Sequence, residues 1–323
     1  MSKEKHQEAL TFRMLRLSIL SLQWREKRDQ NKAYEKAEKR MYQEHPSAYF
    51  VDDRSSADDL ARLQVLDQML TEVMGGVLPE QADPTIFQRV LDVGCGTGGW
   101  LIETARAYPA IPLLVGVDVS SKMVAYAREQ AALQHLEERV EFHVMDALRM
   151  LEFPDHFFDL VNHRAGVSYL RTWEWPKLLQ EYQRVTRSGG IVRISEGEWA
   201  PESSSPALTA LFDLLLRAFF QAGHSFTPER NGVTSQLERL LQQHGLRRVQ
   251  RRLISYDYRA GTKEGQRLLE DMTLTFRIIV PFLRKWTRVP DDYEQMYQQA
   301  LADMQRPDFV ARGHLLTVWG TVL

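Results

Sequence analysis

The sequence predicts an α/β fold with an open, mostly parallel sheet and helices on both of its faces. Three observations favour this fold. A short apolar strand over residues 90–93 leads through a glycine-rich loop into a helix. Further strand-like segments over 113–118, 140–145, 159–164 and 191–196 alternate with helical stretches. Acidic residues also come at or just after the ends of the first three strands, and that edge of a parallel sheet is where ligands bind.

The first strand, loop and helix lie between Arg89 and Pro109, and they predict a nucleotide-binding element. Glycines allow the backbone to pass close to a ligand, and the start of the helix presents free N–H groups. Gly94, Gly96 and Gly99 also satisfy the G-x-G-x-x-G pattern of dinucleotide-binding folds, which is a weak signal alone. Asp92 argues against a pyrophosphate, because its carboxylate suits a ligand that carries ammonium and sulfonium charge.

The stretch Val-Leu-Asp-Val-Gly-Cys-Gly-Thr-Gly-Gly at 90–99 resembles the first motif of class I S-adenosylmethionine-dependent methyltransferases. The resemblance implies a seven-stranded Rossmann-like sheet, mostly parallel with an antiparallel last strand, and S-adenosylmethionine as the cofactor. The segment before this motif is similar to that of quinone-biosynthesis methyltransferases and of fungal secondary-metabolism regulators with the same fold. In such proteins this segment closes over the methionine end of the cofactor.

Cofactor contacts are expected along the edge formed by the strand ends. Asp118 comes about twenty residues after the glycines, where an acid accepts hydrogen bonds from the ribose hydroxyls. Asp146 is placed to accept the adenine amine, and Ala147 to donate a backbone N–H. Taken alone, each of these acids is equally consistent with a helix cap. The full set of expected cofactor contacts is Tyr49, Arg62, Asp92, Gly94, Cys95, Gly96, Asp118, Val119, Met123, Asp146, Ala147 and Asn162.

The first 75 residues predict a helical lid. Helical stretches fill 1–45, and the charged part over 25–44 fits a solvated helix, a lid, or a homodimer contact. A further helix follows, with regularly spaced positions at Asp58, Leu60, Leu63, Leu66, Asp67, Leu70 and Val73. Tyr49 and Arg62 in this region either contact the cofactor or have a structural role. In the structural alternative, Tyr49 packs against its neighbours and Arg62 caps a helix surface.

The remaining chain predicts a cofactor-binding core over 76–200 and a helical substrate cap inserted over 201–245 and 262–310. The final strands of the core fall in 246–261 and 311–323. An apolar stripe over 269–283, bent near Pro281, is either plain core or the wall of a covered, largely apolar pocket.

Candidate catalytic residues lie near the strand ends. His163, at the end of the strand over 159–164, is the first candidate for a general base, and His224 is the second. A histidine bonded only to backbone or cofactor is an equal alternative for His163. Glu196 and Glu198 either bind a polar acceptor or cap a loop, while Arg164 and Arg193 either bind a carboxylate or pair with those glutamates. No His, Asp or Glu grouping has metal-ligand spacing, so no metal is expected.

Composition narrows the class of protein. A net charge of −2 over 323 residues, the single Cys95 and the lack of a long apolar run predict a soluble, cytoplasmic protein with no membrane span. Asn162 is followed by His-Arg-Ala rather than by two prolines and an aromatic residue, which argues against a nucleic-acid substrate. We therefore expect a methyltransferase acting on a small, largely apolar or aromatic metabolite.

Two other functions remain open from the sequence. One is a regulatory or partner-binding protein with this fold and little catalysis. The other is an RNA or protein methyltransferase, for which the basic cluster Arg247, Arg248, Arg251 and Arg252 is the only support.

Overall fold

The computed structural model describes residues 57–323, with side chains described at residue 60 and from Arg62 onward. Three predictions fall partly or wholly outside these residues. They are the homodimer contact through the N-terminal helices, the cofactor contact at Tyr49, and the part of the lid before residue 57.

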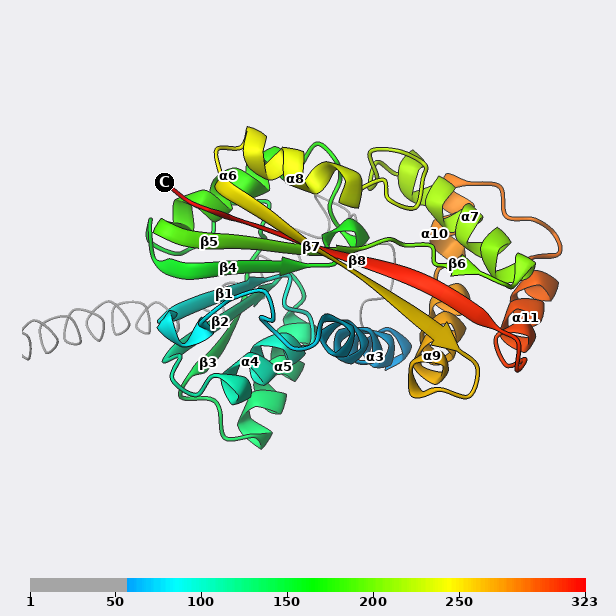
Figure 1. Ribbon diagram of the computed structural model, residues 1–323, viewed down its shortest axis with the longest axis horizontal. Coiled ribbons are helices and arrows are strands. Elements are labelled where there is room, and N and C mark those ends of the chain that lie inside the picture. The colour runs from blue at the N-terminus through cyan, green and yellow to red at the C-terminus, as the bar shows by residue number, and fades with distance from the viewer. Residues whose placement is uncertain (1–56) are drawn as a thin grey trace, which may run out of the picture. The chain divides into compact units, whose positions relative to one another are not determined.

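A mixed sheet forms the centre of the described chain (Figure 1). Five strands run parallel in the order β3-β2-β1-β4-β5, and β8 pairs antiparallel with β5. The other edge of β8 pairs with β7, also antiparallel. The bounds are β1 Arg89–Val93, β2 Leu113–Asp118, β3 Val140–Val144, β4 Phe158–Arg164, β5 Thr186–Gly197, β7 Arg247–Arg259 and β8 Val310–Thr321. The predicted parallel sheet with an antiparallel last strand is thus confirmed.

The strand count within residues 57–323 is eight, rather than the seven expected. The extra strand is β6 (Glu202–Ser203), which pairs with Arg312 and Ala311 of β8. It forms because β8 extends past the end of β5, so this part of its edge can pair with the chain that leaves β5.

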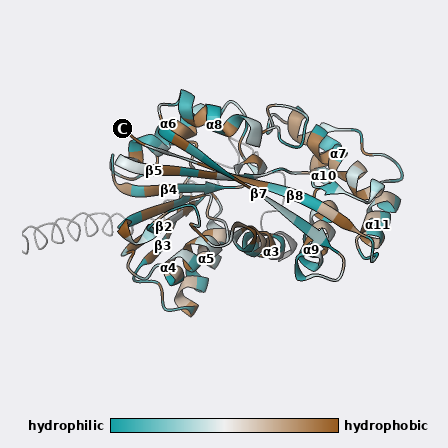
Figure 2. Cartoon of the chain, viewed as in Figure 1, coloured by the Kyte–Doolittle hydropathy of each residue, from teal (hydrophilic) through white to brown (hydrophobic). Residues whose placement is uncertain are grey.

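Helices cover both faces of the sheet (Figure 1). The pair α4 (Gly99–Ala107) and α5 (Ser121–Leu133) lies on one face, and α6 (Trp175–Val185) and α8 (Thr234–Gln243) lie on the other. Ser120 caps α5, since its hydroxyl accepts a hydrogen bond from the Met123 N–H. Brown and teal residues both appear on α6 in Figure 2, as expected of a helix that buries one side against a sheet.

The helical cap gathers beyond the carboxyl ends of β4 and β5. It contains α7 (Pro206–Gln221), α9 (Lys263–Ile278), α10 (Val280–Trp286) and α11 (Tyr293–Asp303). The predicted bend near Pro281 is a break between α9 and α10, because proline has no N–H to continue the helix. Phe212, Phe219, Phe276 and Leu283 pack in one apolar cluster. No helix in the described part of the chain is long and apolar enough to cross a membrane.

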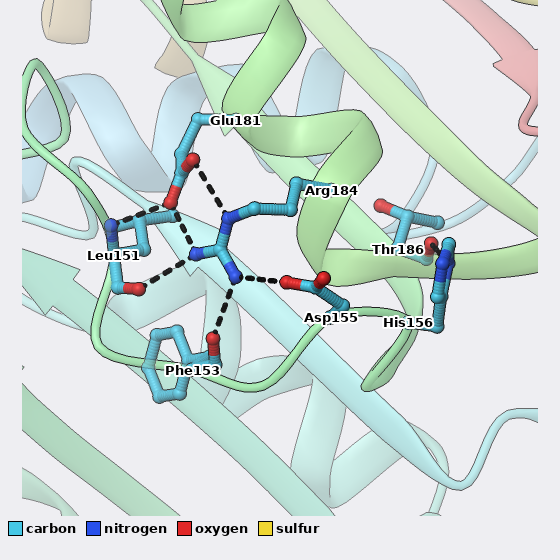
Figure 3. A network of polar contacts seen from close by, with 7 residues as sticks. All are labelled: Leu151, Phe153, Asp155, His156, Glu181, Arg184 and Thr186. Carbon is cyan, nitrogen blue, oxygen red and sulfur yellow. Dashed lines mark hydrogen bonds and ion pairs between the residues drawn. The ribbon is translucent and has the colours of Figure 1, made fainter.

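Arg184 ties the loop after β3 to α6 (Figure 3). Its guanidinium donates to the carbonyls of Leu151 and Phe153 at 2.8 and 2.9 Å, and to the Asp155 carboxylate at 2.6 Å. Glu181 receives two further N–H groups of Arg184 and also accepts the Leu151 N–H at 2.6 Å. This loop is therefore held by backbone contacts that no shorter side chain at position 184 would reproduce.

Strand β7 is one edge of the sheet, and no other strand of the described chain pairs with its free side. Four exposed arginines lie on it, at Arg247, Arg248, Arg251 and Arg252. Arg251 forms an ion pair with Glu238 of α8, with 3.6 Å between Nε and Oε2. The helix α3 (Ala57–Met74) packs mainly against α9 and α4, and it also contacts β7, where the Tyr258 hydroxyl donates to Met69 Sδ at 3.4 Å.

A buried polar network crosses three neighbouring strands. Asn162 of β4 donates to Asp92 of β1 at 2.7 Å and accepts from Arg193 of β5 at 2.6 Å. Arg193 also donates to Glu80 at 2.7 Å. Asn162 and Arg193 are fully buried, and the Glu80 side chain is only 2% exposed. The Arg193 charge is therefore balanced inside the protein by Glu80.

We predict that Glu80→Gln lowers the free energy of unfolding by about 3 to 5 kcal/mol, because it leaves the buried Arg193 cation without its carboxylate. Urea denaturation followed by circular dichroism measures this loss. The double variant Glu80→Gln/Arg193→Met is the control, since it removes both charges and should lose less stability than Glu80→Gln. Equal stability of wild type and Glu80→Gln would contradict this account.

Candidate functional site

The glycine loop between β1 and α4 is drawn tightly against the end of β2. The N–H groups of Gly94 and Cys95 both donate to the Val117 carbonyl, at 2.8 and 3.0 Å. Gly94, Gly96 and Gly98 all have positive φ, which favours glycine. A Cβ at Gly98 would lie 2.6 Å from the Phe142 ring, whereas no atom lies within 4 Å of a Cβ built at Gly96. The loop therefore packs on one side and leaves open space beside Gly96.

Asp118 is fixed at the end of β2 by two backbone N–H groups. Its carboxylate accepts from Gly96 at 3.0 Å and from Ser120 at 2.8 Å, and it stays partly exposed. The Met145 N–H donates to the Asp118 carbonyl at 3.0 Å, which brings the turn after β3 alongside. In that turn Asp146 accepts from the Leu148 N–H at 2.9 Å. The structure thus brings two of the predicted acids together beside the glycine loop.

The other predicted residues of this edge lie in the same turns. Val119 follows Asp118 directly, Ala147 follows Asp146, and both are partly buried. Met123 lies in the first turn of α5 with 5% of its surface exposed. Cys95 is buried within the loop, and burial raises the pKa of its thiol well above the usual value.

Asp92 is buried beneath the loop rather than exposed beside it. Burial is the main cause that raises its pKa to about 7, while Arg164 and the hydrogen bond from Asn162 act in the opposite direction. The Asn162 amide is likewise buried, and it donates a hydrogen bond to Asp92 and accepts one from Arg193. The Asp92 carboxyl thus changes its charge near neutral pH, where a nearby cation would favour its ionised form.

Helix α3 brings over the glycine loop an acid that was not among the predicted site residues. Asp67 forms an ion pair with Arg164 at the end of β4. A side chain at Gly99 would collide with the Asp67 carboxylate, so the two elements lie in close contact. Arg62, a predicted cofactor contact on the same helix, is 2% exposed and lies near the buried Asp271 of α9. Burial raises the pKa of Asp271, and the Arg62 charge opposes that rise.

His163 lies fully buried at the end of β4. Its Nδ1 is 2.5 Å from the Tyr182 hydroxyl, and its Nε2 is 3.5 Å from the Tyr169 hydroxyl and 3.7 Å from Glu196 Oε1. Burial lowers the pKa of His163 to about 3 and raises that of Glu196 to about 8. At pH 7 both groups are therefore mostly neutral.

The turn after β4 closes over the His163 ring. Ala165 has a φ of 55°, unusual for a residue with a side chain, and Gly166 follows it. A side chain at Gly166 would collide with His163 Nε2. Tyr169, from the same turn, stacks on the His163 ring, and its hydroxyl lies against Gly94. Tyr169 thus joins this cluster to the glycine loop through its hydroxyl.

His224, the second catalytic candidate, lies at a different place. It follows α7, is fully buried, and its Nδ1 is 2.8 Å from the Leu170 carbonyl. Its ring packs near Phe219 and Phe282 of the cap. The structure thus gives it a backbone contact and aromatic neighbours rather than a contact with His163.

Sequence analysis left open whether Arg164 and Arg193 pair with Glu196 and Glu198, and the described residues show other partners for both arginines. Arg164 pairs with Asp67 and Arg193 pairs with Glu80, so neither pairs with Glu196 or Glu198. The partners come from α3 and from the loop before β1, both distant in sequence. Of the residues missed, Asp67 carried a signal, because it is an acid among the apolar positions of its helix. Tyr169 and Tyr182 carried none.

The residues present fit S-adenosylmethionine. The open side of Gly96, the partly exposed Asp118 and Asp146, and the buried Asp92 together suit an adenosine with a positively charged tail. In the described residues no group of three or more His, Cys, Asp or Glu side chains is arranged to hold a metal ion.

Comparison with known proteins agrees with this geometry. Residues 90–190 match the methyltransferase domain family. The chain is 31% identical over 153 residues to 27-O-demethylrifamycin SV methyltransferase of Amycolatopsis mediterranei, covering 47% of this chain and 52% of that protein. It is 36% identical over 115 residues to demethylmenaquinone methyltransferase of Porphyromonas gingivalis, covering 35% of this chain and 45% of that protein. The curated relatives it matches are covered over about a fifth to a half of their length.

A solved structure shares the fold. Phosphoethanolamine N-methyltransferase 2 of Haemonchus contortus, in complex with phosphomonomethylethanolamine and S-adenosylhomocysteine, superposes with a TM-score of 0.52 at 18% identity. The match covers 85% of this chain and 60% of that one. Over residues 90–190 the chain is thus similar to the methyltransferase domain family, and it shares its fold with a methyltransferase whose solved structure contains S-adenosylhomocysteine.

Proposed function

We propose that this protein transfers the methyl group of S-adenosylmethionine to a small-molecule acceptor. The observation that carries the proposal is the pairing of Asp118 with the Gly96 N–H, beside Asp146, at the carboxyl ends of β2 and β3. This is the edge at which open parallel sheets bind ligands. The named relatives that support it act on small molecules, as their names state.

Each residue of the edge has a defined part in the proposal. Asp118 binds the ribose hydroxyls, and Asp146 with the Ala147 N–H binds adenine. Gly94, Cys95 and Gly96 lie against the methionine part, with Val119 and Met123 flanking the adenosine. Asp92 and Asn162 beneath the loop provide negative charge and orientation for the cationic end. Tyr49 and Arg62 stay predicted contacts from the N-terminal segment.

The bound cofactor supplies a methyl carbon activated by sulfonium. The protein must align the acceptor, hold it near that carbon and exclude water. Helix α3 lies over the glycine loop through the Asp67–Arg164 pair, and the cap adds an apolar cluster beyond β4 and β5. We infer that α3 and the cap together enclose the acceptor, in a pocket that is largely apolar and covered.

Two measurements test the function. Isothermal calorimetry with S-adenosylhomocysteine should detect binding at one site per chain. Incubation of the full chain with methyl-labelled S-adenosylmethionine and a metabolite extract should place label in small molecules. Label confined to RNA or protein would overturn the small-molecule acceptor, and binding without any transfer would favour the regulatory alternative.

We predict that Asp118→Ala weakens S-adenosylhomocysteine binding at least about tenfold, because two charge-assisted hydrogen bonds to the ribose are lost. Calorimetry measures the change in Kd. Asp213→Ala is a matched control on α7, outside the proposed cofactor site. Wild-type affinity in Asp118→Ala would remove this residue from the site.

We also predict that cofactor binding releases a proton from Asp92. With a pKa of about 7 this carboxyl is about half protonated at pH 7, and a nearby cation lowers its pKa. S-adenosylmethionine binding should therefore release about half a proton at pH 7 and weaken as the pH falls below 7. Calorimetry in buffers of different ionisation enthalpy measures this release. Asp92→Asn should lack it, and equal release in both proteins would contradict the assignment.

A further inference from the structure

Glu196 is a buried acid, and no lysine or arginine of the described residues forms an ion pair with it. It lies at the end of β5, is fully buried, and its Oε1 accepts the Gly166 N–H at 2.5 Å. The Val167 N–H also acts on this carboxyl. Its other oxygen, Oε2, has no hydrogen-bond partner among the described residues. Within the same residues its only ion-pair distance is the 3.7 Å to His163 Nε2.

This arrangement constrains the protons that the pair can hold. A buried carboxylate beside a neutral imidazole leaves an uncompensated charge, and so does a buried imidazolium beside a neutral acid. The states that balance are an acid with a neutral imidazole, or a carboxylate with an imidazolium. Both contain one dissociable proton shared by the two groups. Burial favours the first, since it raises the pKa of Glu196 to about 8 and lowers that of His163 to about 3.

The pair is connected to the proposed methyl-transfer site through one side chain. His163 is fully buried, so a bound acceptor would not reach it directly. Tyr169 lies between, with its hydroxyl 3.5 Å from His163 Nε2 and against Gly94 of the cofactor loop. At the other nitrogen of the ring, the Tyr182 hydroxyl lies 2.5 Å from His163 Nδ1. His163, Tyr169 and Tyr182 are thus the titratable groups that face Glu196, from β4, the following turn and α6.

We propose that Tyr169, His163 and Glu196 form a path that takes the proton of the methyl acceptor, with Glu196 as its final holder. The proposal rests on the proposed methyltransferase function and narrows its acceptor to a hydroxyl or amine that loses a proton. Tyr169 is then the catalytic residue. His163 and Glu196 are positioning residues that act through it.

The step starts from the pair without its shared proton, with Glu196 ionised and His163 neutral, which is the state reached above about pH 8. A lone pair of the acceptor oxygen or nitrogen forms a bond to the methyl carbon, and the carbon–sulfur bond breaks with its electron pair left on sulfur. The acceptor proton moves to the Tyr169 oxygen while the Tyr169 hydroxyl proton moves to His163 Nε2. The proton then passes from Nε2 to the Glu196 carboxylate. Burial raises the pKa of Tyr169 well above its usual value, so a free phenolate does not form. The Tyr169 hydroxyl instead donates its proton to His163 at the same time as it accepts the proton of the methyl acceptor.

The shared proton can be tested without any acceptor. The full chain, labelled with ¹³C at glutamate carboxyls and ¹⁵N in histidine and bound to S-adenosylhomocysteine, is titrated by NMR. We expect the carboxyl signal that is absent in Glu196→Gln to titrate near pH 8, with His163 neutral down to about pH 5. Glu270→Gln, at an exposed position of α9, should leave that signal in place. A Glu196 midpoint near its ordinary 4.5, or a His163 midpoint near 6.5, would overturn the pair.

The proton path is tested by the pH dependence of labelled-methyl transfer. In wild type the rate should rise about tenfold per pH unit and level off above about pH 8, because ionised Glu196 is the active form. In Glu196→Gln the rate should no longer rise with pH, and kcat should fall at least about 100-fold. The Kd for S-adenosylhomocysteine should stay unchanged. Tyr169→Phe should lower kcat similarly, and Glu196→Asp should recover part of the rate.

The outcomes separate the path from the function beneath it. Transfer whose pH dependence is the same in wild type and Glu196→Gln would overturn the path and leave the methyltransferase function standing. Transfer only to acceptors that carry no dissociable proton would also overturn the path. No cofactor binding in wild type would overturn the proposed function, while the NMR titration of the protein without ligand would still decide the shared proton.

Discussion

The pairing of β1, β4 and β5 in one parallel register is the constraint on which the site depends. It places Asp92 opposite Asn162 and Asn162 opposite Arg193, so three polar side chains meet on one face of the sheet. A slip of one residue would turn each of them to the other face, where the network could not form. Buried polar groups need hydrogen-bond partners, and this register provides them for Asp92 and Arg193. The same register fixes where the glycine loop and His163 lie along the strand direction.

Segments outside the sheet supply the remaining charges. Glu80 from the loop before β1 neutralises Arg193, and Asp67 from α3 neutralises Arg164. Helix α3 is also attached to the cap, since Glu72 pairs with Lys263 and Arg267 of α9. One helix therefore joins the cofactor loop to the cap. These contacts connect the glycine loop with α9 of the cap outside the sheet.

Much of the fold could be predicted because its signals are local. The glycine loop, Asp118 at the end of β2, Asp146 just after β3, and the break at Pro281 each follow from neighbouring residues. The partners of Arg164 and Arg193 could not be predicted, because they depend on where α3 and the loop carrying Glu80 pack. The cluster of His163, Tyr182 and Glu196 likewise joins β4, α6 and β5, and burial rather than residue type shifts the pKa of His163 and Glu196. The two-residue β6 has too few residues to show a strand pattern.

The free side of β7 has a consequence for the protein at high concentration. An unpaired strand offers backbone groups to any other extended chain, and such edges often start aggregation. Here Arg247, Arg248, Arg251 and Arg252 line it, and only Arg251 has an acidic neighbour, Glu238, within ion-pair distance in the described chain. A second molecule adding its own β7 would bring guanidinium groups opposite one another. Their mutual repulsion disfavours edge-to-edge stacking, and dissolved salt would weaken that protection by screening it.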